Sequence, residues 1–367
     1  MDQDQKRPPS IVMELGAETC KVGLSSESAP TAAIRTVVGR PMNKRVSALR
    51  DHYVGDEALL KQDVLGIRRP LRRGRVDSWD DMILLWQYAF KEVLRVNPEE
   101  HPVLLSEQPL VPPVNREKMT QVLFETFNVP KMYVASQPVL TLFSIGKITG
   151  LNVDTGLDAT YAVPINNGFV VREGVRRVDL GGHDLTAFMQ RSIEQKGVLT
   201  QHANTLVHHL CFVAQDLETE LTSPNLQVSY QLPDGQVVNV GPERVLAPEG
   251  LFNPSVIGSE AMSVPQLVRE AIIDSPAVLH KSLAKNVVLS GGPRLLPGYS
   301  TRLKTELEAR LTDLPIGVWG QEKNPAPSAW TGGAIFAELP TFQNLWITKA
   351  EYDDHGPAIV HKKCDLV

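Results

Sequence analysis

Ile11-Val12-Met13-Glu14-Leu15-Gly16, followed by Thr19-Cys20-Lys21-Val22-Gly23-Leu24, has a near copy midway along the chain. The copy reads Gly150-Leu151-Asn152-Val153-Asp154-Thr155-Gly156, followed by Ala159-Thr160-Tyr161-Ala162-Val163-Pro164. Each stretch is an apolar strand, an acid, one spacer, a glycine and a second strand. A hairpin of this kind can press bare backbone N–H groups against a phosphate, and its acid points toward the metal that such a phosphate carries. Two copies predict a duplicated domain with a nucleotide between its halves.

Length and composition place the chain among ordinary globular proteins. Its 367 residues are too many for one simple core and suit two lobes. The net charge of −5 excludes a general basic field for nucleic acid, so no direct sequence-specific nucleic-acid binding is expected. One local exception is Arg68-Arg69-Pro70-Leu71-Arg72-Arg73-Gly74-Arg75, with five arginines in eight residues. Taken alone, this run indicates a solvated surface turn rather than a ligand patch.

Cysteine usage and the N-terminal residues bear on the compartment. Cys20, Cys211 and Cys364 are widely spaced and show no Cys-x-x-Cys pattern, which favours a reduced cytosolic or nuclear compartment. The first residues, Met1-Asp2-Gln3-Asp4-Gln5-Lys6-Arg7, are polar and do not read as a signal peptide. No apolar run approaches the ~20 residues needed to span a bilayer, so no membrane insertion is expected.

Strand and helix patterns alternate along the chain. Ser78 is a predicted N-cap for a helix with apolar residues at helical spacing through Val93, and Asn115 is a predicted cap for a helix ending at Phe127. Further helices are predicted around Leu185–Ile193, over Asn204–Leu217 and over Leu303–Leu311. Short apolar strands lie between them, and this alternation predicts an α/β architecture.

Several stretches are long and specific enough to carry a family resemblance. They are Cys20-Lys21-Val22-Gly23, Val38-Gly39-Arg40-Pro41, Tyr53-Val54-Gly55-Asp56-Glu57-Ala58, Trp79-Asp80-Asp81-Met82, Pro98-Glu99-Glu100-His101-Pro102, Asn115-Arg116-Glu117-Lys118-Met119-Thr120-Gln121, Phe124-Glu125-Thr126-Phe127-Asn128, Leu232-Pro233-Asp234-Gly235-Gln236-Val237, Val288-Leu289-Ser290-Gly291-Gly292 and Gly356-Pro357-Ala358-Ile359-Val360-His361. In these stretches, and over nearly all its length, the chain resembles actin.

The resemblance implies a duplicated ribonuclease-H-like core in two lobes, with four subdomains around a nucleotide cleft. Subdomain 1 would comprise 1–35, 70–144 and 328–367, and subdomain 2 would comprise 36–69. Subdomain 3 would comprise 145–180 and 260–327, and subdomain 4 would comprise 181–259. The ligand implied by the resemblance is ATP or ADP with Mg²⁺ or Ca²⁺.

The resemblance also assigns roles at the nucleotide site. Lys21 matches a phosphate-contacting lysine, and Gln137 matches the glutamine that orients the attacking water. Asp154, and less directly Glu14, would face the metal through its water shell. Backbone positions around the nucleotide match at Gly16, Gly156, Gly181, Gly182, Gly291 and Gly292.

Departures from the family pattern gather in the same site. They are Glu14 in place of Asp, Ala17 of Ser, Glu18 of Gly, Leu157 of Asp, Asp158 of Gly, Tyr161 of His, Val207-His208 of a Lys-Glu pair, Pro293 of Thr and Ala326 of Lys. Glu18 adds a negative charge beside phosphates, and two like charges ~4 Å apart repel by ~4 kcal/mol at an intermediate dielectric. Leu157 removes a metal-facing carboxylate. So many changes around one ligand predict a degraded ATP site, with nucleotide binding weak or absent and hydrolysis inefficient.

The protein-binding surfaces implied by the resemblance are mixed. The loop between Pro41 and Tyr53, which inserts into the next subunit in actin filaments, is shorter here and has lost its apolar tip. A hydrophobic cleft between subdomains 1 and 3, which receives amphipathic helices from partners in this family, is better kept. Its expected lining is Phe143, Ile335, Leu339 and Leu345.

Three functions remain open from the sequence. The first is a divergent actin-related structural protein, bound to an actin or actin-like filament or to a fixed multi-subunit complex, in the cytoplasm and cytoskeleton or in the nucleus. The second is a polymerising ATPase of the conventional actin type. The third, a sugar or metabolite kinase of the same superfold, lacks a separate acceptor-binding motif in the sequence.

Overall fold

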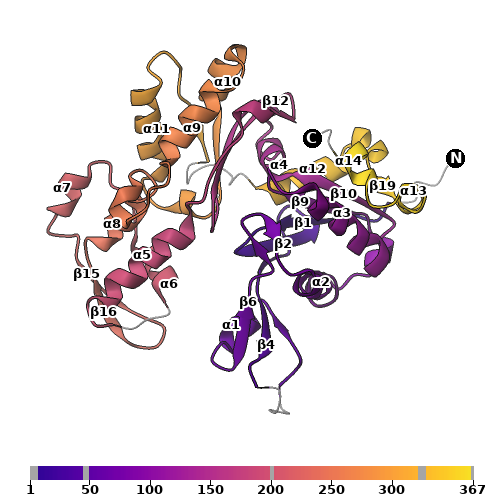
Figure 1. Cartoon of the computed structure of the whole chain (residues 1–367), viewed down its shortest axis with the longest axis horizontal. Helices are drawn as coiled ribbons and strands as arrows, with labels where there is room; N and C mark the ends of the chain where they lie inside the picture. Colours follow the sequence, from indigo (N-terminus) through magenta and orange to yellow (C-terminus); the bar gives the residue numbers. More distant parts are fainter. Residues whose placement is uncertain (1–6, 44–48, 199–201, 321–327, 365–367) are drawn as a thin grey trace. The chain divides into compact units, whose positions relative to one another are not determined.

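The computed structural model describes residues 7–43, 49–198, 202–320 and 328–364, and divides the chain into two compact units. Unit 1 comprises Met1–Ile148 with Pro327–Val367, and unit 2 comprises Thr149–Ala326. Each unit is built on a mixed sheet of its own with helices packed against it (Figure 1). The finer division into four subdomains stays a prediction.

The main sheet of unit 1 has six strands in the order β19-β10-β9-β1-β2-β3. Strands β1, β9 and β10 run parallel, whereas β2 and β3 continue from β1 as an antiparallel meander. Central strand β9 is buried at every position, as expected of a parallel strand covered on both faces. The strand bounds are β1 Ile11–Leu15, β2 Thr19–Leu24, β3 Ala32–Arg35, β9 Val103–Glu107, β10 Lys131–Ser136 and β19 Ile347–Thr348.

The main sheet of unit 2 repeats this topology. Strand β11 pairs in parallel with β17 on one side and antiparallel with β12 on the other, as β1 pairs with β9 and β2. The order is β13-β12-β11-β17-β18, with β14 also paired to β12. The bounds are β11 Gly150–Thr155, β12 Thr160–Asn166, β13 Phe169–Val170, β14 Arg176–Val178, β17 Val287–Ser290 and β18 Val318–Trp319. The duplication predicted from the two hairpins is therefore present in the strand pairing.

Helices pack against the sheets of unit 1. Ser78 caps α2 by accepting a hydrogen bond from the backbone N–H of Asp81 (3.4 Å), and Asp80 and Asp81 lie in its first turn, as predicted. Trp86 is fully buried, and its ring lies 6.3 Å from that of Phe127. The helices of unit 1 are α1 Asp56–Leu60, α2 Trp79–Tyr88 with the π-helical η1 Ala89–Leu94, α3 Pro113–Gln121 with the π-helical η3 Val122–Thr126, α4 Gln137–Phe143, α12 Ala329–Glu338, α13 Lys349–His355 and α14 Ile359–Lys363, with short 3₁₀ turns η2 Pro98–Glu100 and η8 Pro340–Asn344.

Two small β elements complete unit 1. A three-stranded sheet has the order β5-β4-β6, and α1 packs against it. A two-stranded hairpin, β7-β8, follows β6 directly. Their bounds are β4 Val38–Pro41, β5 Tyr53–Val54, β6 Leu65–Arg68, β7 Leu71–Arg72 and β8 Arg75–Val76.

Unit 2 packs its helices around a second apolar core, which includes Leu185, Met189, Val268 and Leu303. The hairpin predicted around Pro233-Asp234-Gly235 is present as β15 Val228–Gln231 and β16 Val237–Val240. The helices are α5 Gly182–Glu194, α6 Ala203–Leu210, α7 Leu217–Leu221, α8 Glu243–Glu249, α9 Val264–Ile273, α10 His280–Lys285 and α11 Tyr299–Arg310, with 3₁₀ turns η4 Arg172–Gly174, η5 Pro254–Ile257, η6 Ala277–Leu279 and η7 Pro293–Leu295.

Two helix predictions were wrong in detail. The helix predicted over Asn204–Leu217 ends early, because the backbone of Cys211 is extended and ends α6 at Leu210, and the next helix, α7, begins only at Leu217. Asn115 does not cap its helix, since α3 begins at Pro113, whose fixed φ suits the first turn of a helix.

Candidate functional site

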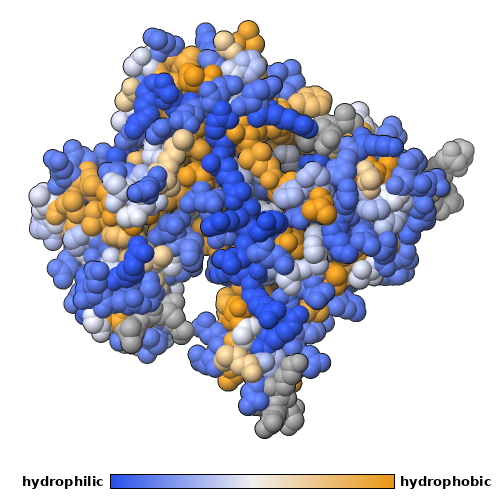
Figure 2. All heavy atoms as spheres, viewed as in Figure 1, coloured by the Kyte–Doolittle hydropathy of each residue, from blue (hydrophilic) through white to orange (hydrophobic). Residues whose placement is uncertain are grey.

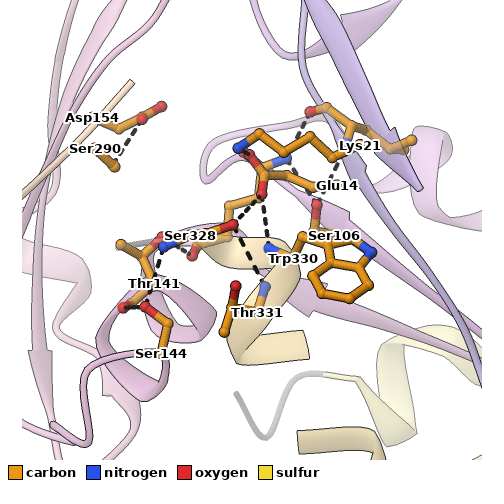
Figure 3. Close-up of polar contacts among 12 residues, drawn as sticks. Glu14, Lys21, Ser106, Thr141, Ser144, Asp154, Ser290, Ser328, Trp330 and Thr331 are labelled. Carbon is orange, nitrogen blue, oxygen red and sulfur yellow. Dashed lines mark hydrogen bonds and ion pairs between the residues drawn. The ribbon is translucent and has the colours of Figure 1, made fainter. Parts of the chain in front are cut away.

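The acid of the first hairpin turn, Glu14, has both carboxylate oxygens occupied. Glu14 and Lys21 are directly opposite on β1 and β2, and Oε1 lies 2.7 Å from the Lys21 ammonium. Oε2 accepts hydrogen bonds from the backbone N–H of Trp330 (2.7 Å) and the hydroxyl of Ser328 (3.2 Å). Figure 3 shows these groups converging on the Glu14 carboxylate.

The groups bonded to Oε2 belong to the N-terminus of α12. Ser328 is the N-cap of this helix and accepts from the backbone N–H of Thr331, while the Ser328 N–H donates to the Ser144 hydroxyl (3.1 Å). A carboxylate at a helix N-terminus is stabilised by the unpaired N–H groups and the helix dipole. Glu14 therefore acts as an internal cap for α12 and as the counterion of Lys21.

Glu18, in the same turn, is paired with two arginines. One carboxylate oxygen contacts the guanidinium of Arg35, at the end of β3, and the other lies 2.9 Å from Nη1 of Arg69. Arg69 also donates to the Ala17 carbonyl (3.2 Å). The two guanidinium groups reduce the repulsion that the charge of Glu18 alone would exert on a phosphate.

The turn itself is tightly built. A Cβ at Gly16 would lie 2.6 Å from the Thr19 carbonyl oxygen, so only glycine fits there without a shift. The Gly16 carbonyl accepts from the Thr36 hydroxyl (2.7 Å), and the Glu18 carbonyl accepts from the Thr36 N–H (3.0 Å). Thr36 therefore fixes the turn from the β3 side.

Gln137, the predicted water-orienting residue, is buried at the start of α4. Its amide nitrogen donates to the Leu15 carbonyl (2.6 Å) and to the Ser106 hydroxyl (2.9 Å). The same hydroxyl accepts from the Leu15 N–H (3.1 Å). Gln137 and Ser106 thus anchor the end of β1 just before the first turn.

The second hairpin turn carries Asp154, an acid predicted to face a metal. Oδ1 of Asp154 accepts a hydrogen bond from the Ser290 hydroxyl (2.8 Å; Figure 3). The Ser290 hydroxyl in turn accepts from the side-chain amide of Asn152 (3.1 Å). Leu157, half-buried, offers no oxygen ligand at the position where the family has an acid.

Tyrosines on either side of Asp154 are held neutral. The Tyr299 hydroxyl bonds the hydroxyl of Thr155 (3.0 Å), and burial raises the pKa of Tyr299 to about 12, with a further upward contribution from Asp154. Tyr161 is buried beneath the Arg177 guanidinium, 5.5 Å from its ring centre, and burial raises its pKa as well. Neither tyrosine supplies a charge near the second turn at neutral pH.

Among the glycines predicted to match backbone positions around the nucleotide, Gly181, Gly182, Gly291 and Gly292 differ in what they contact. A Cβ at Gly181 would lie 2.6 Å from the carbonyl oxygens of both Gly156 and Leu157, and the N–H of Gly182 bonds the first of these carbonyls (3.0 Å). Gly291, at φ 87°, lies so close to β11 that a Cβ would overlap the Thr155 carbonyl, whereas Gly292 faces open space. Gly181 and Gly291 are therefore required by close backbone packing within unit 2.

The four residues predicted for the partner cleft all lie in unit 1. The side chains of Ile335, on α12, and Leu339, just after it, are 46% and 37% exposed. Phe143 stacks on Phe336 with ring centres 5.4 Å apart, and Leu345 is half-buried against the same core. An exposed apolar pair thus flanks a buried aromatic cluster.

The chain matches the family model for actin over residues 5–207 and 200–365. It belongs to the actin family. Both the predicted family and the predicted fold class are thereby confirmed. The match does not distinguish a structural role from that of an active ATPase.

The side chains of each turn can be compared with those that a metal nucleotide of the actin family would need. Among the residues that the structure describes, no group of three or more His, Cys, Asp and Glu side chains could hold a metal ion. In the first turn, the acid predicted to face a metal is engaged by Lys21 and α12. In the second turn, Leu157 stands at one of the two positions where the family has an acid. Each turn, taken by itself, therefore fits a catalytic metal nucleotide poorly.

Some residues singled out in the sequence are not described by the structure, and some contacts in the structure were not predicted from the sequence. Residues 44–48, in the loop between Pro41 and Tyr53, and Ala326 lie outside the described residues. In the described part of the chain, no helix is both long and apolar enough to cross a membrane. Sequence reasoning missed Arg35, Ser106 and Ser328, because each lies far along the chain from the turn residue that it contacts. Arg69 was noticed only as part of the arginine run.

Proposed function

We propose that this member of the actin family is a structural protein, a subunit or binding surface in a filament or fixed complex, with little ATP turnover. The observation that carries the proposal is the double engagement of Glu14 with Lys21 and with the N-terminus of α12. Moving Glu14 toward a metal would leave Lys21 and the helix N-terminus without their acceptor, at a cost of about 1–3 kcal/mol.

Gln137 and Leu157 support the same proposal. The amide nitrogen of Gln137 already donates to Leu15 and Ser106, so only its amide oxygen is left to orient an attacking water. An aliphatic side chain at position 157 cannot bind a metal-bound water. The second turn therefore lacks a part that efficient hydrolysis in this family would need.

A nucleotide remains compatible with a structural role. Retained features include Lys21, Asp154 and the glycines of both turns. We propose that ATP or ADP with Mg²⁺ or Ca²⁺, where it binds, serves as a structural ligand and binds weakly. At roughly 100 times its dissociation constant, such a ligand would add about 2.7 kcal/mol of stability.

The proposed partners are proteins. The exposed pair Ile335 and Leu339 offers an apolar surface beside the aromatic cluster of Phe143, Phe336 and Phe342. An amphipathic helix of a filament or complex subunit has the matching chemistry. We propose a cytoplasmic and cytoskeletal location, with the nucleus as the alternative.

The test compares the structural protein with the polymerising ATPase. Full-length purified protein is incubated with ATP and Mg²⁺, and phosphate release is followed together with pelleting at high speed. Adenine nucleotide is also measured in the supernatant of boiled protein. The proposal expects no phosphate release above a heat-treated control, whether or not the protein pellets. Phosphate release that rises in step with pelleting would establish the ATPase instead.

A matched pair of variants sharpens the test. Leu157→Asp restores a carboxylate to the second turn, while Leu157→Asn has nearly the same shape but no charge. If the missing carboxylate limits metal binding, the Asp variant alone gains Mg²⁺-dependent thermal stabilisation by ATP. Equal thermal stabilisation of the two variants by ATP and Mg²⁺ would show that the missing carboxylate at position 157 does not limit metal binding.

A further inference from the structure

The arginine run noted in the sequence folds into a small hairpin, Leu71–Val76, formed by β7, a two-residue turn and β8. Leu71 and Val76 are cross-strand partners, and both are buried in the main core of unit 1. Arg72 and Arg75 are the next cross-strand pair, and both are exposed. The hairpin is therefore anchored by its apolar pair and presents its arginine pair to solvent.

This arrangement places like charges directly opposite one another. Side chains of an opposed cross-strand pair lie about 5 Å apart at Cβ, where like charges destabilise the pairing. Within the described residues, no carboxylate pairs with Arg68 or Arg72, and Arg75 has only Asp77, with Nε and Oδ1 3.4 Å apart. Two opposed guanidinium groups destabilise the hairpin, and a turn that is merely exposed to solvent would not need them.

The turn residue adds a second unfavourable feature. Arg73 has φ 51° and Gly74 has φ 77°, so both central residues of the turn are left-handed. Such turns favour Asn-Gly, because the Cβ of most other residues is crowded against the backbone in this conformation. The hairpin thus carries an arginine where local conformation opposes it, and local conflicts of this kind mark functional surfaces.

We propose that the arginine hairpin, with Arg68 beside it, is a docking surface for an acidic peptide segment of a partner protein. The planar guanidinium fork matches a carboxylate with two parallel hydrogen bonds. The two opposed arginines suit neighbouring Asp and Glu side chains of an extended segment. Figure 2 shows a strongly hydrophilic surface where the small sheet β4-β5-β6 adjoins the rest of unit 1.

The observations favour a peptide over nucleic acid or a membrane. The chain carries a net charge of −5, which repels extended polyanions. The hairpin sequence Leu71-Arg72-Arg73-Gly74-Arg75-Val76 has no aromatic side chain on which a base could stack. A short acidic segment can engage the hairpin without meeting the acidic remainder of the surface. This docking surface would operate whether or not the chain hydrolyses ATP.

The test measures binding of a fluorescein-labelled oligoglutamate peptide to the full-length protein by fluorescence anisotropy at low salt. Arg72→Gln with Arg75→Gln is expected to weaken binding about tenfold, the size expected for two charge-assisted contacts at an exposed site. The matched control, Arg172→Gln with Lys281→Gln, removes the same charge from exposed positions of unit 2. It is expected to change binding by less than about twofold.

Three results would overturn the proposal. They are no peptide binding by the unaltered protein, equal weakening by the two paired variants, and hairpin-dependent binding of duplex DNA or phosphatidylserine vesicles that exceeds peptide binding. A melting temperature separates docking from a structural role. The Arg72→Gln/Arg75→Gln protein should melt no lower than the unaltered protein, because it loses a like-charge pair. A lower melting temperature would assign the arginines to the fold instead.

Discussion

The two hairpin turns share one strand topology but differ in how their acids are used. In the first turn, Glu14 and Glu18 are both held by cations, and Glu14 also caps α12. In the second turn, Asp154 contacts the hydroxyl of Ser290, and the neighbouring family acid is replaced by Leu157. The difference teaches that an acid retained at a family position is not thereby available to a ligand, since its neighbours decide what it binds.

The largest expected effect concerns the backbone behind the second turn. Gly291→Ala places a Cβ against the Thr155 carbonyl at a left-handed φ, so we expect a loss of more than about 3 kcal/mol in the free energy of unfolding. Gly292→Ala, where a Cβ meets open space, should cost less than about 1 kcal/mol. Urea denaturation of both variants checks this. Equal stability of the two would mean that β11 can move away from Gly291.

The next effect is a loss of stability in alkali through Tyr299. Its pKa rises from the ordinary value of 10 to about 12 in the folded chain, so the folded state holds the proton more tightly than the unfolded state. This stabilisation is complete below pH 10 and is lost as the pH rises toward 12, by roughly 2–3 kcal/mol.

Tyr299→Phe removes the titrating group and should flatten that part of the curve of unfolding free energy against pH. At neutral pH it should cost only about 1 kcal/mol, for the hydrogen bond to Thr155. Phe cannot ionise, so an unchanged alkaline slope in this variant would place the titration elsewhere.

A third effect tests the role of Glu14 in the first turn. Glu14→Gln keeps the shape but removes the charge facing Lys21 and α12, so we expect about 2 kcal/mol of destabilisation. Lys21→Met and the double variant complete a thermodynamic cycle. A coupling energy near zero would show that Lys21 is not held by Glu14, and would weaken the proposed structural role of the acid.

The smallest effect concerns Glu18. Glu18→Gln leaves Arg69 without its carboxylate and Arg35 with Asp56 alone (Nε to Oδ1 3.7 Å), at a partly exposed site. We therefore expect about 1 kcal/mol of destabilisation that shrinks at high salt. The exposed pair of Lys304 and Glu308 supplies the control, since Glu308→Gln should change stability by less than about 0.5 kcal/mol. A salt-independent loss at Glu18 would point to packing rather than charge.

Periodic and repeated features were predictable from the sequence, whereas irregular boundaries were not. Apolar spacing located α2 and α5, and the Pro233-Asp234-Gly235 turn located the β15-β16 hairpin. The break at Cys211 was missed because Phe212, Val213 and Ala214 continue the run of apolar residues although they are not helical. The start of α3 was misplaced because Asn115 is a good capping residue in isolation, although the chain turns helical earlier, at Pro113.

The sequence by itself determined that the chain has a duplicated actin fold. The repeated strand-acid-glycine pattern and the long matching stretches depend only on the local order of residues, so they can be recognised without a structure. Only the tertiary structure decided what the acids of the first turn contact. The partners of Glu14 on α12 are more than 300 residues away in sequence, and Arg69 is 51 residues from Glu18. Charge pairing depends on distance in space, and strand pairing and helix packing set those distances.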